Sequence, residues 1–203
     1  MDYTAIMPPV AKPNKAGLVF EITSSAPCGT EPSANICLYQ ALPKGDKLEL
    51  IIQKCVELGV SKIIPIMTER CVTRLSKSDI SKKATRYQRI AESAAGQSMR
   101  GKIPEVSPAC LFVEALSSAK HPLALVAHEQ ERTTSLKSAL VQWSHTPVKN
   151  ISIWIGPEGG FTSGEISTLG EAGAVAVSLG PRVLRTETAA ISAVAQIICL
   201  CEE

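Results

Sequence analysis

Two glycine-rich segments near the carboxyl end of the chain contain residue types that can hold a ligand and act on it. The first, residues 156–160, has the sequence Gly-Pro-Glu-Gly-Gly and follows an apolar run at 151–155. The second, residues 180–186, contains Arg182 and Arg185. Glycine lets a ligand approach the backbone closely, and loops that follow strands offer free backbone N–H groups. The pair therefore predicts two walls of one pocket.

The first glycine segment does not have the pattern of a phosphate-binding loop. It lacks the Gly-Lys-Ser/Thr ending of a P-loop and the G-x-G-x-x-G spacing of a dinucleotide-binding fold. The carboxylate of Glu158 would repel a phosphate, so we expect a ligand that is neutral or cationic at that point. The alternative is that both segments are ordinary strand-to-helix turns, and their spacing alone leaves that alternative open.

The elements around these segments alternate between strand and helix. Thr162 followed by Glu165 predicts a capping box, so a helix should begin directly after the first segment. A strand at 174–179 and a closing helix at 187–201 flank the second segment. Upstream, the patterns predict an apolar segment at 35–41, helices at 46–58 (with Asp46 and Glu49 as a capping pair), 81–97, 111–116 and 135–143, and strands at 60–67, 103–106 and 123–127. This alternation predicts an α/β fold with a mostly parallel sheet and helices on both faces.

Composition limits the class of protein. The chain has 203 residues, 45% of them hydrophobic, which is enough for one α/β domain with a small appendage. Its seven cysteines and three histidines have no metal-ligand spacing, so we expect no metal and a reducing cytoplasm. No apolar run reaches the roughly 18 residues of a membrane span, and the first residues lack the pattern of a signal peptide.

Positive charge is concentrated in one segment. Residues 70–102 contain nine basic and two acidic residues, a net charge of +7, whereas the whole chain has only +2. A basic block in a nearly neutral protein indicates a polyanion such as RNA, and the alternative is a solvated helix face. The predicted RNA-binding residues are Arg74, Lys82, Lys83, Arg86 and Arg89.

The two glycine segments resemble the signatures of a known family. Residues 155–161 read Ile-Gly-Pro-Glu-Gly-Gly-Phe, and residues 179–189 read Leu-Gly-Pro-Arg-Val-Leu-Arg-Thr-Glu-Thr-Ala. Both are similar to motifs of the RsmE family, SPOUT-class methyltransferases that act on N3 of a uridine in small-subunit ribosomal RNA. Weaker likeness at 42–47, 57–59, 68–70 and 92–98 extends the resemblance over residues 36–203.

The resemblance implies a fold, a cofactor and partners. It implies S-adenosylmethionine as methyl donor, 16S ribosomal RNA of the small subunit as substrate, a cytoplasmic homodimer, and a carboxyl-terminal trefoil knot in a SPOUT domain at 36–203. Residues 1–35, with one strand-like stretch at 16–23, resemble a shortened remnant of a PUA-like RNA-binding β domain. From that shortening we expect intact binding of the methyl donor and weak, salt-sensitive binding of RNA.

The resemblance and the chemistry of the loops together define candidate site residues. The predicted cofactor-binding residues are Ile155, Gly156, Pro157, Glu158, Gly159, Gly160, Leu179, Gly180, Val183, Leu184 and Thr186. Glu158 has two alternative roles: facing the cationic end of the methyl donor, or holding its loop through backbone N–H groups. The predicted catalytic residues are Arg185, Glu187 and Arg70. The arginines, with Arg182 as a further candidate, would stabilise charge on the uracil oxygens, and Glu187 would accept the N3 proton.

Several alternatives stay open. Thr186, Glu187 and Thr188 can instead cap the closing helix, and His128 is left outside the catalytic set because a lone histidine is more often structural. At the level of the whole protein, a non-catalytic RNA-binding or ribosome-assembly protein with the same fold is one alternative. A related enzyme that methylates ribose 2′-hydroxyls is another, although such enzymes usually have an asparagine-bearing motif where this chain has residues 178–181.

Overall fold

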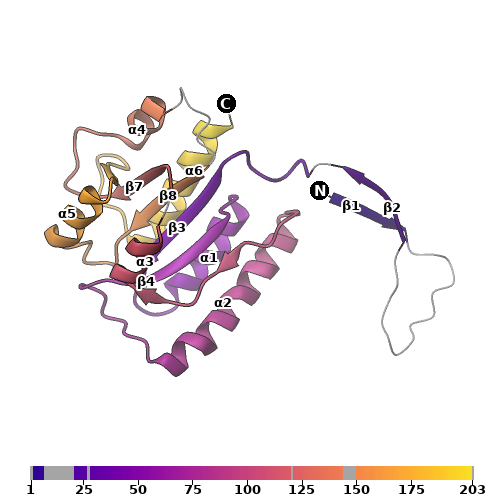
Figure 1. Cartoon of the computed structure of the whole chain (residues 1–203), viewed down its shortest axis with the longest axis horizontal. Helices are drawn as coiled ribbons and strands as arrows, with labels where there is room; N and C mark the ends of the chain where they lie inside the picture. The colour runs from indigo at the N-terminus through magenta and orange to yellow at the C-terminus, as the bar shows by residue number, and fades with distance from the viewer. Residues whose placement is uncertain (1, 7–20, 27, 120, 144–149, 203) are drawn as a thin grey trace.

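The computed structural model describes residues 2–6, 21–26, 28–119, 121–143 and 150–202. Within them, the main body is a seven-stranded sheet whose neighbouring strands all run parallel (Figure 1). Its strand order is β5-β4-β3-β8-β7-β9, with β6 also paired to β4. The strands are β3 (Asn35–Ala41), β4 (Lys62–Met67), β5 (Glu105–Val106), β6 (Cys110–Leu111), β7 (Leu123–Ala127), β8 (Asn150–Ile155) and β9 (Val175–Val177). The predicted α/β class with a mostly parallel sheet is confirmed.

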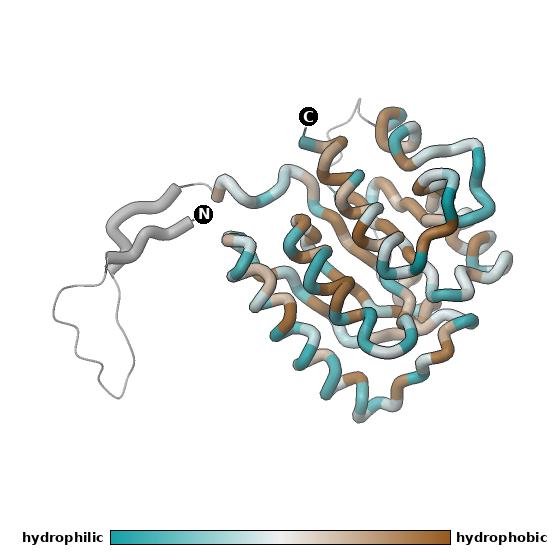
Figure 2. Tube along the Cα trace, turned by 180° about the vertical axis from the view of Figure 1, so that it is seen from behind, coloured by the Kyte–Doolittle hydropathy of each residue, from teal (hydrophilic) through white to brown (hydrophobic). Residues whose placement is uncertain are grey.

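Six helices lie in the described residues; five of them connect strands, and the sixth follows the last strand. They are α1 (Lys47–Glu57), α2 (Lys77–Gln97), α3 (Phe112–Ser118), α4 (Leu136–Trp143), α5 (Ser163–Glu171) and α6 (Thr186–Cys201). Figure 2 views one face of the sheet, on which α1 lies between α2 and α6 and α6 contacts β3 and β8. In the described part of the chain, no helix is both long and apolar enough to cross a membrane.

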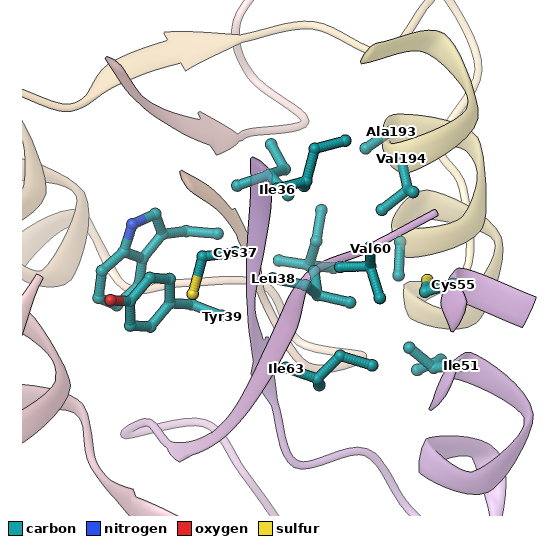
Figure 3. Packing of buried hydrophobic residues seen from close by; sticks show 14 of the residues in the cluster. Ile36, Cys37, Leu38, Tyr39, Ile51, Cys55, Val60, Ile63, Ala193 and Val194 are labelled. Atoms are coloured by element: carbon teal, nitrogen blue, oxygen red, sulfur yellow. The ribbon is translucent and has the colours of Figure 1, made fainter. Parts of the chain in front are cut away.

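Side chains of the central strands alternate between the two faces of the sheet. Ile36, Leu38 and Ile63 point toward α1 and α6, where Cys55 and Val194 meet them (Figure 3). These residues are fully or almost fully buried, because strands covered on both faces bury every side chain.

The opposite face carries an aromatic cluster. Tyr39 of β3 stacks on Trp154 of β8, with ring centroids 3.9 Å apart and an interplanar angle of 3°. Phe112 of α3 packs its ring against Trp154 edge-on, at 6.0 Å between centroids. Since α3 contributes to this face and α1 and α6 to the other, the prediction of helices on both faces is confirmed.

The helix caps only partly follow the predicted patterns. At α5, Thr162 accepts a hydrogen bond from the Glu165 backbone and the Glu165 carboxylate accepts one from the Thr162 backbone, which confirms the capping box. At α1, the predicted Asp46–Glu49 capping pair is wrong. Asp46 precedes the helix without a side-chain cap, and Glu49 pairs with Arg86 of α2 at 2.8 Å instead. The Glu49 carboxylate therefore forms an ion pair between α1 and α2 and does not cap α1.

The start of α2 and the amino-terminal segment differ most from the sequence patterns. Helix α2 begins at Lys77, four residues before the predicted start, because the Ser76 hydroxyl accepts a hydrogen bond from the Asp79 backbone and caps it there. In the amino-terminal segment, β1 (Asp2–Ile6) and β2 (Glu21–Ala26) form a separate antiparallel two-stranded sheet. Most of the strand expected at 16–23 lies outside the described residues, and β2 includes its last three positions.

Candidate functional site

Three loops meet at the carboxyl edge of the sheet. They follow β7, β8 and β9, which lie side by side in the sheet. The chain first leaves β3 toward β4 and later fills the other side of β3 with β8, so the strand order reverses there. Such a reversal opens a crevice outside the strand ends, where α/β proteins bind ligands. A cavity of about 430 Å³ lies beside this reversal, lined by the loops that follow β7, β8 and β9 and by Lys47 of α1. Its volume is typical of small-molecule sites.

The cavity brings the two glycine segments together. All residues predicted to bind a cofactor line it, and so do Arg182 and Arg185. The lining also includes residues that were not among the predicted site residues: Lys47, Ala127, Glu129, Arg132, Ser178 and Ala189, together with His128, which had been set aside.

The first glycine loop is folded tightly on itself. The Gly160 backbone N–H donates to the Pro157 carbonyl at 2.9 Å, and Gly160 has a φ of 66°, which favours glycine. A Cβ on Gly156 would lie 3.0 Å from the Gly160 carbonyl carbon. A side chain at either position would therefore open the loop and change the cavity wall.

Glu158 holds this loop against the segment that precedes α1. Its Oε1 accepts hydrogen bonds from the Lys44 backbone at 3.1 Å and from the Lys47 ammonium at 2.9 Å. Partial burial acts to raise the pKa of Glu158, but Lys47 and backbone N–H groups outweigh it and keep the pKa below its usual value. Of the two alternatives for Glu158, this geometry favours loop holding, with Lys44 supplying a backbone N–H from outside the loop.

Thr186 connects the second glycine loop to the first. Helix α6 begins with Arg185 as N-cap, and that position makes no side-chain capping bond. The Thr186 hydroxyl instead donates to the Gly156 carbonyl at 2.6 Å. The capping alternative is therefore wrong for Thr186, because its hydroxyl crosses to the other loop.

Arg185 is the one predicted catalytic residue that lines the cavity. Its side chain and that of Arg182 are exposed at the second glycine loop. Exposed guanidinium groups at the wall of a pocket can approach a bound substrate and stabilise negative charge on it.

The other two predicted catalytic residues lie outside the cavity lining. Glu187 faces Lys47, with 3.4 Å between its Oε2 and the ammonium nitrogen. Arg70 donates hydrogen bonds to the carbonyls of Gly159 at 2.8 Å and Phe161 at 3.3 Å, so it supports the first glycine loop from behind. Catalytic roles for these two residues stay predictions, and their contacts are those of residues that hold the site together.

The loop after β7 forms a third wall that the cofactor prediction did not include. It contributes His128, Glu129 and Arg132, and the Glu129 carboxylate lies 3.1 Å from where a Cβ on Gly160 would be. The sequence did contain a signal: His128 and Glu129 directly follow an apolar strand, and such strand ends are candidate site positions.

Glu131 fixes the shape of this third wall. Its carboxylate accepts hydrogen bonds from the Thr133 hydroxyl and from the backbone N–H groups of Thr133 and Thr134, at 2.6–2.8 Å. These bonds, led by the Thr133 hydroxyl, lower the pKa of Glu131 to about 2. The Glu131 carboxylate therefore stays ionised at neutral and mildly acidic pH, and it keeps its hydrogen bonds to the loop.

The predicted RNA-binding residues fall into two groups. Lys82, Lys83, Arg86 and Arg89 belong to α2, and all but Lys83 are well exposed. Arg86 makes the ion pair with Glu49, and Lys83 lies 5.9 Å from the centre of the Tyr87 ring. Arg74 precedes α2 and donates to the Glu69 carbonyl at 2.9 Å. The structure thus gathers most of these cations on one helix.

In the described ranges, no group of three or more His, Cys, Asp or Glu side chains is arranged to hold a metal ion. The cavity contains charged, apolar and backbone groups from three loops, and this mixture suits an organic ligand with both polar and apolar parts.

Comparison with known proteins agrees with this arrangement. Residues 30–198 match the family of RNA methyltransferase domains. The chain is 37% identical over 191 residues to ribosomal RNA small subunit methyltransferase E of Bacillus subtilis (strain 168), covering 93% of this chain and 73% of that protein. The protein of the same name from Mesomycoplasma hyopneumoniae (strain 232) is 34% identical over 183 residues, covering 90% of this chain and 75% of that protein.

Solved structures share the fold. Ribosomal RNA small subunit methyltransferase E from Neisseria gonorrhoeae, bound to S-adenosyl methionine, has a TM-score of 0.76 and 35% identity, covering 89% of this chain and 72% of that one. A putative methyltransferase from Legionella pneumophila, in complex with the bound cofactor SAM, has a TM-score of 0.78 and 36% identity, covering 96% and 77%. On the match over most of its length and the identity to these relatives, the chain belongs to the ribosomal RNA small subunit methyltransferase E family.

Proposed function

We propose that the protein transfers a methyl group from S-adenosylmethionine to N3 of a uridine in 16S ribosomal RNA of the small subunit. The observation that carries the proposal is the cavity of about 430 Å³ between the glycine loops. It lies where the fold places ligands, in a chain whose relatives at 35–36% identity were solved with S-adenosylmethionine bound. The choice of uridine N3 rests on the resemblance of residues 155–161 and 179–189 to the family motifs.

The residues of the cavity fit this methyl donor. Ile155, Leu179 and Leu184 provide apolar surface for the faces of an adenine ring, and the backbone around Gly156 and Gly180 provides groups for its polar edge. Carboxylates and arginines both reach the lining, which suits the mixed charge of a sulfonium amino acid. When bound, the donor supplies an activated methyl group, and the task of the protein is to align the uracil with it.

Uridine N3 carries a proton that must leave before the methyl group is accepted. As it leaves, negative charge grows on the two flanking carbonyl oxygens. Arg185 and Arg182 both line the cavity, and their guanidinium groups would stabilise that charge. Among the lining residues, His128 and Glu129 are additional candidates to receive the proton, because the Glu187 carboxylate is directed at Lys47.

We propose that ribosomal RNA binds across the exposed side of α2. Four of the predicted RNA-binding cations belong to this helix, which packs against α1. The amino end of α1 carries Lys47 at the cavity. Phosphate contacts by lysine and arginine supply most of the affinity of such interfaces. The family resemblance adds four further parts to this proposal: a trefoil knot, a homodimer, a PUA-like character of residues 1–35, and action on ribosomes in the cytoplasm.

Incubation with labelled S-adenosylmethionine and small ribosomal subunits that lack the modification tests the function. We expect one labelled uridine, which reverse transcription should map because N3 methylation blocks base pairing. Label on a ribose hydroxyl would contradict the N3 assignment. Tight RNA binding without binding of the methyl donor would instead support the non-catalytic alternative.

A further inference from the structure

Gln40 is not part of the cavity lining, but it contacts Thr186, which is. It is the sixth residue of β3 and is fully buried. Its side-chain nitrogen donates to the Thr186 hydroxyl at 3.0 Å and to the Ala41 carbonyl at 2.8 Å. Since the Thr186 hydroxyl donates onward to the Gly156 carbonyl, a chain of two hydrogen bonds runs from β3 through α6 to the first glycine loop.

The direction of this chain is fixed by its acceptors. The carbonyl of Gly156 can only accept, so the Thr186 hydroxyl must give it the proton. Toward Gln40 the same hydroxyl can then only accept, so the amide NH₂ of Gln40, and not its oxygen, must face it. The carbonyl of Ala41 is also an acceptor only, so both contacts of Gln40 require the same orientation of its amide.

This orientation leaves the Gln40 side-chain oxygen buried without a hydrogen-bond partner among the described residues. A buried polar atom without a partner is unfavourable, and an apolar side chain of similar length would avoid it. The stability of the sheet alone therefore does not explain a glutamine at this position. Buried groups that break the packing rules in this way concentrate at functional sites.

We infer that Gln40 is a positioning residue of the methyl-donor pocket, setting the Thr186 hydroxyl that holds the Gly156 carbonyl. The carbonyl is thereby drawn toward α6, and the tight loop at 156–160 presents its other backbone groups to the cavity. Without the amide, the Thr186 side chain can rotate away from the Gly156 carbonyl. The hydrogen bond that joins the two glycine loops is then weakened. The inference rests on the proposed function, because it concerns the affinity of that pocket for its ligand.

Gln40→Met tests the inference, because methionine has a similar length and no hydrogen-bonding amide. We expect its dissociation constant for S-adenosylmethionine, measured by calorimetry, to rise roughly 5–10-fold, the range for one lost hydrogen bond. The melting temperature should stay the same or rise. Gln53→Met, at an exposed glutamine of α1, is the matched control and should change neither quantity.

A double-mutant cycle with Thr186→Val tests the route of the effect. If Gln40 acts through Thr186, the double variant binds the methyl donor about as weakly as Thr186→Val alone. Additive losses would overturn the inference, as would unchanged affinity in Gln40→Met or a loss of affinity that merely follows a fall in melting temperature.

Hydrogen exchange separates this inference from the proposed function. In the ligand-free protein, we expect faster exchange of the backbone amides within 156–160 in Gln40→Met than in the wild type, with exchange in β8 unchanged. If the wild type failed to bind S-adenosylmethionine, the proposed function would fall, and the exchange measurement would still decide the positioning role. Equal exchange at 156–160 would refute that role.

Discussion

Lys47 and Glu158 form an ion pair, 2.9 Å between Nζ and Oε1, that joins the amino end of α1 to the first glycine loop. The same ammonium lies 3.4 Å from the carboxylate of Glu187 at the start of α6. Glu158 raises the pKa of Lys47 by hydrogen bonding, so the lysine stays charged. The Lys47 ammonium therefore lies close to the carboxylates of both Glu158 and Glu187. Without this cation, the two carboxylates would repel each other.

Lys47→Met should weaken binding of the methyl donor by roughly 3–10-fold, because two carboxylates lose their shared cation and the loops separate. The pair is partly exposed, so the effect should be larger at low ionic strength than at high. Calorimetry at two salt concentrations measures both quantities. Lys54→Met is the control, since Lys54 is in the same helix and pairs with Glu57 away from the cavity. Equal effects of the two substitutions would contradict this role for Lys47.

Gly160→Ala should weaken binding of the methyl donor much more than Gly159→Ala. Gly160 has a positive φ, which costs an alanine roughly 1–2 kcal/mol. Its new Cβ would also press on the Glu129 carboxylate at 3.1 Å. A Cβ on Gly159 meets Arg70 at 3.5 Å, an ordinary contact. If both variants bound equally well by calorimetry, the shape of the loop would not matter for the ligand.

Local patterns in the sequence predicted the helices, the two glycine loops and most strands of the main sheet, because these depend on neighbouring residues. They did not predict β1 or β6. Thr162 and Glu165 cap α5 as expected, since both partners belong to one turn of helix. Asp46 and Glu49 have the same spacing, and that prediction was wrong because Arg86, 37 residues away, competes for Glu49. Contacts between distant residues decide such cases, and spacing does not contain them.

The candidate site was predictable to a similar extent. The glycine loops supplied most of the cavity lining, but Gln40 and Lys47 were missed because their partners are 146 and 111 residues away. Arg70 was predicted from its position at a strand end, and that position is correct. The direction of its side chain, toward the carbonyl of Gly159, depends on packing that the sequence does not reveal.

Arg185→Ala should lower the turnover number by ~10²–10³ and leave the affinity for the methyl donor nearly unchanged. The guanidinium is exposed at the cavity and is proposed to act on charge that develops only when uridine loses its N3 proton. Single-turnover rates and calorimetry measure the two effects separately. A parallel fall in both would identify Arg185 as a residue that builds the pocket.

Arg100→Met should destabilise the fold by roughly 3 kcal/mol, because it leaves one member of a buried ion pair alone. Arg100 has a side chain only 3% exposed and pairs with Glu31 at 2.9 Å. It also donates to the carbonyls of Val56 and Val60 at the end of α1. The melting temperature should fall by roughly 6–12 °C for a domain of this size. An unchanged melting temperature would show that the pair contributes little.

The same ion pair should make stability depend on pH. Burial acts to raise the pKa of Glu31, but the Arg100 guanidinium outweighs it and lowers the pKa below the ordinary 4.5. A lowered pKa contributes stability that is complete above pH 4.5 and lost as the pH falls through the folded value. Denaturation between pH 6 and 3 should therefore be steeper for the wild type than for Glu31→Gln. Parallel curves would contradict the prediction.

Reversing charge on α2 should weaken RNA binding without affecting the methyl donor. We choose Lys82, Lys83 and Arg89 and leave Arg86 intact, because its ion pair with Glu49 helps to hold α1 against α2. If each of the three contacts one phosphate, the triple glutamate variant should lose roughly 0.7–0.9 per contact from the slope of log affinity against log salt.

The melting temperature of the triple variant and its affinity for S-adenosylmethionine should match the wild type, since none of the three residues lines the cavity. Lys54→Glu, in the last turn of α1, is the control for the effect of a single charge reversal away from α2. A slope equal to that of the control would mean that α2 carries only a solvated face, and the RNA would then have to be held by Arg132, Arg182 and Arg185 around the cavity itself.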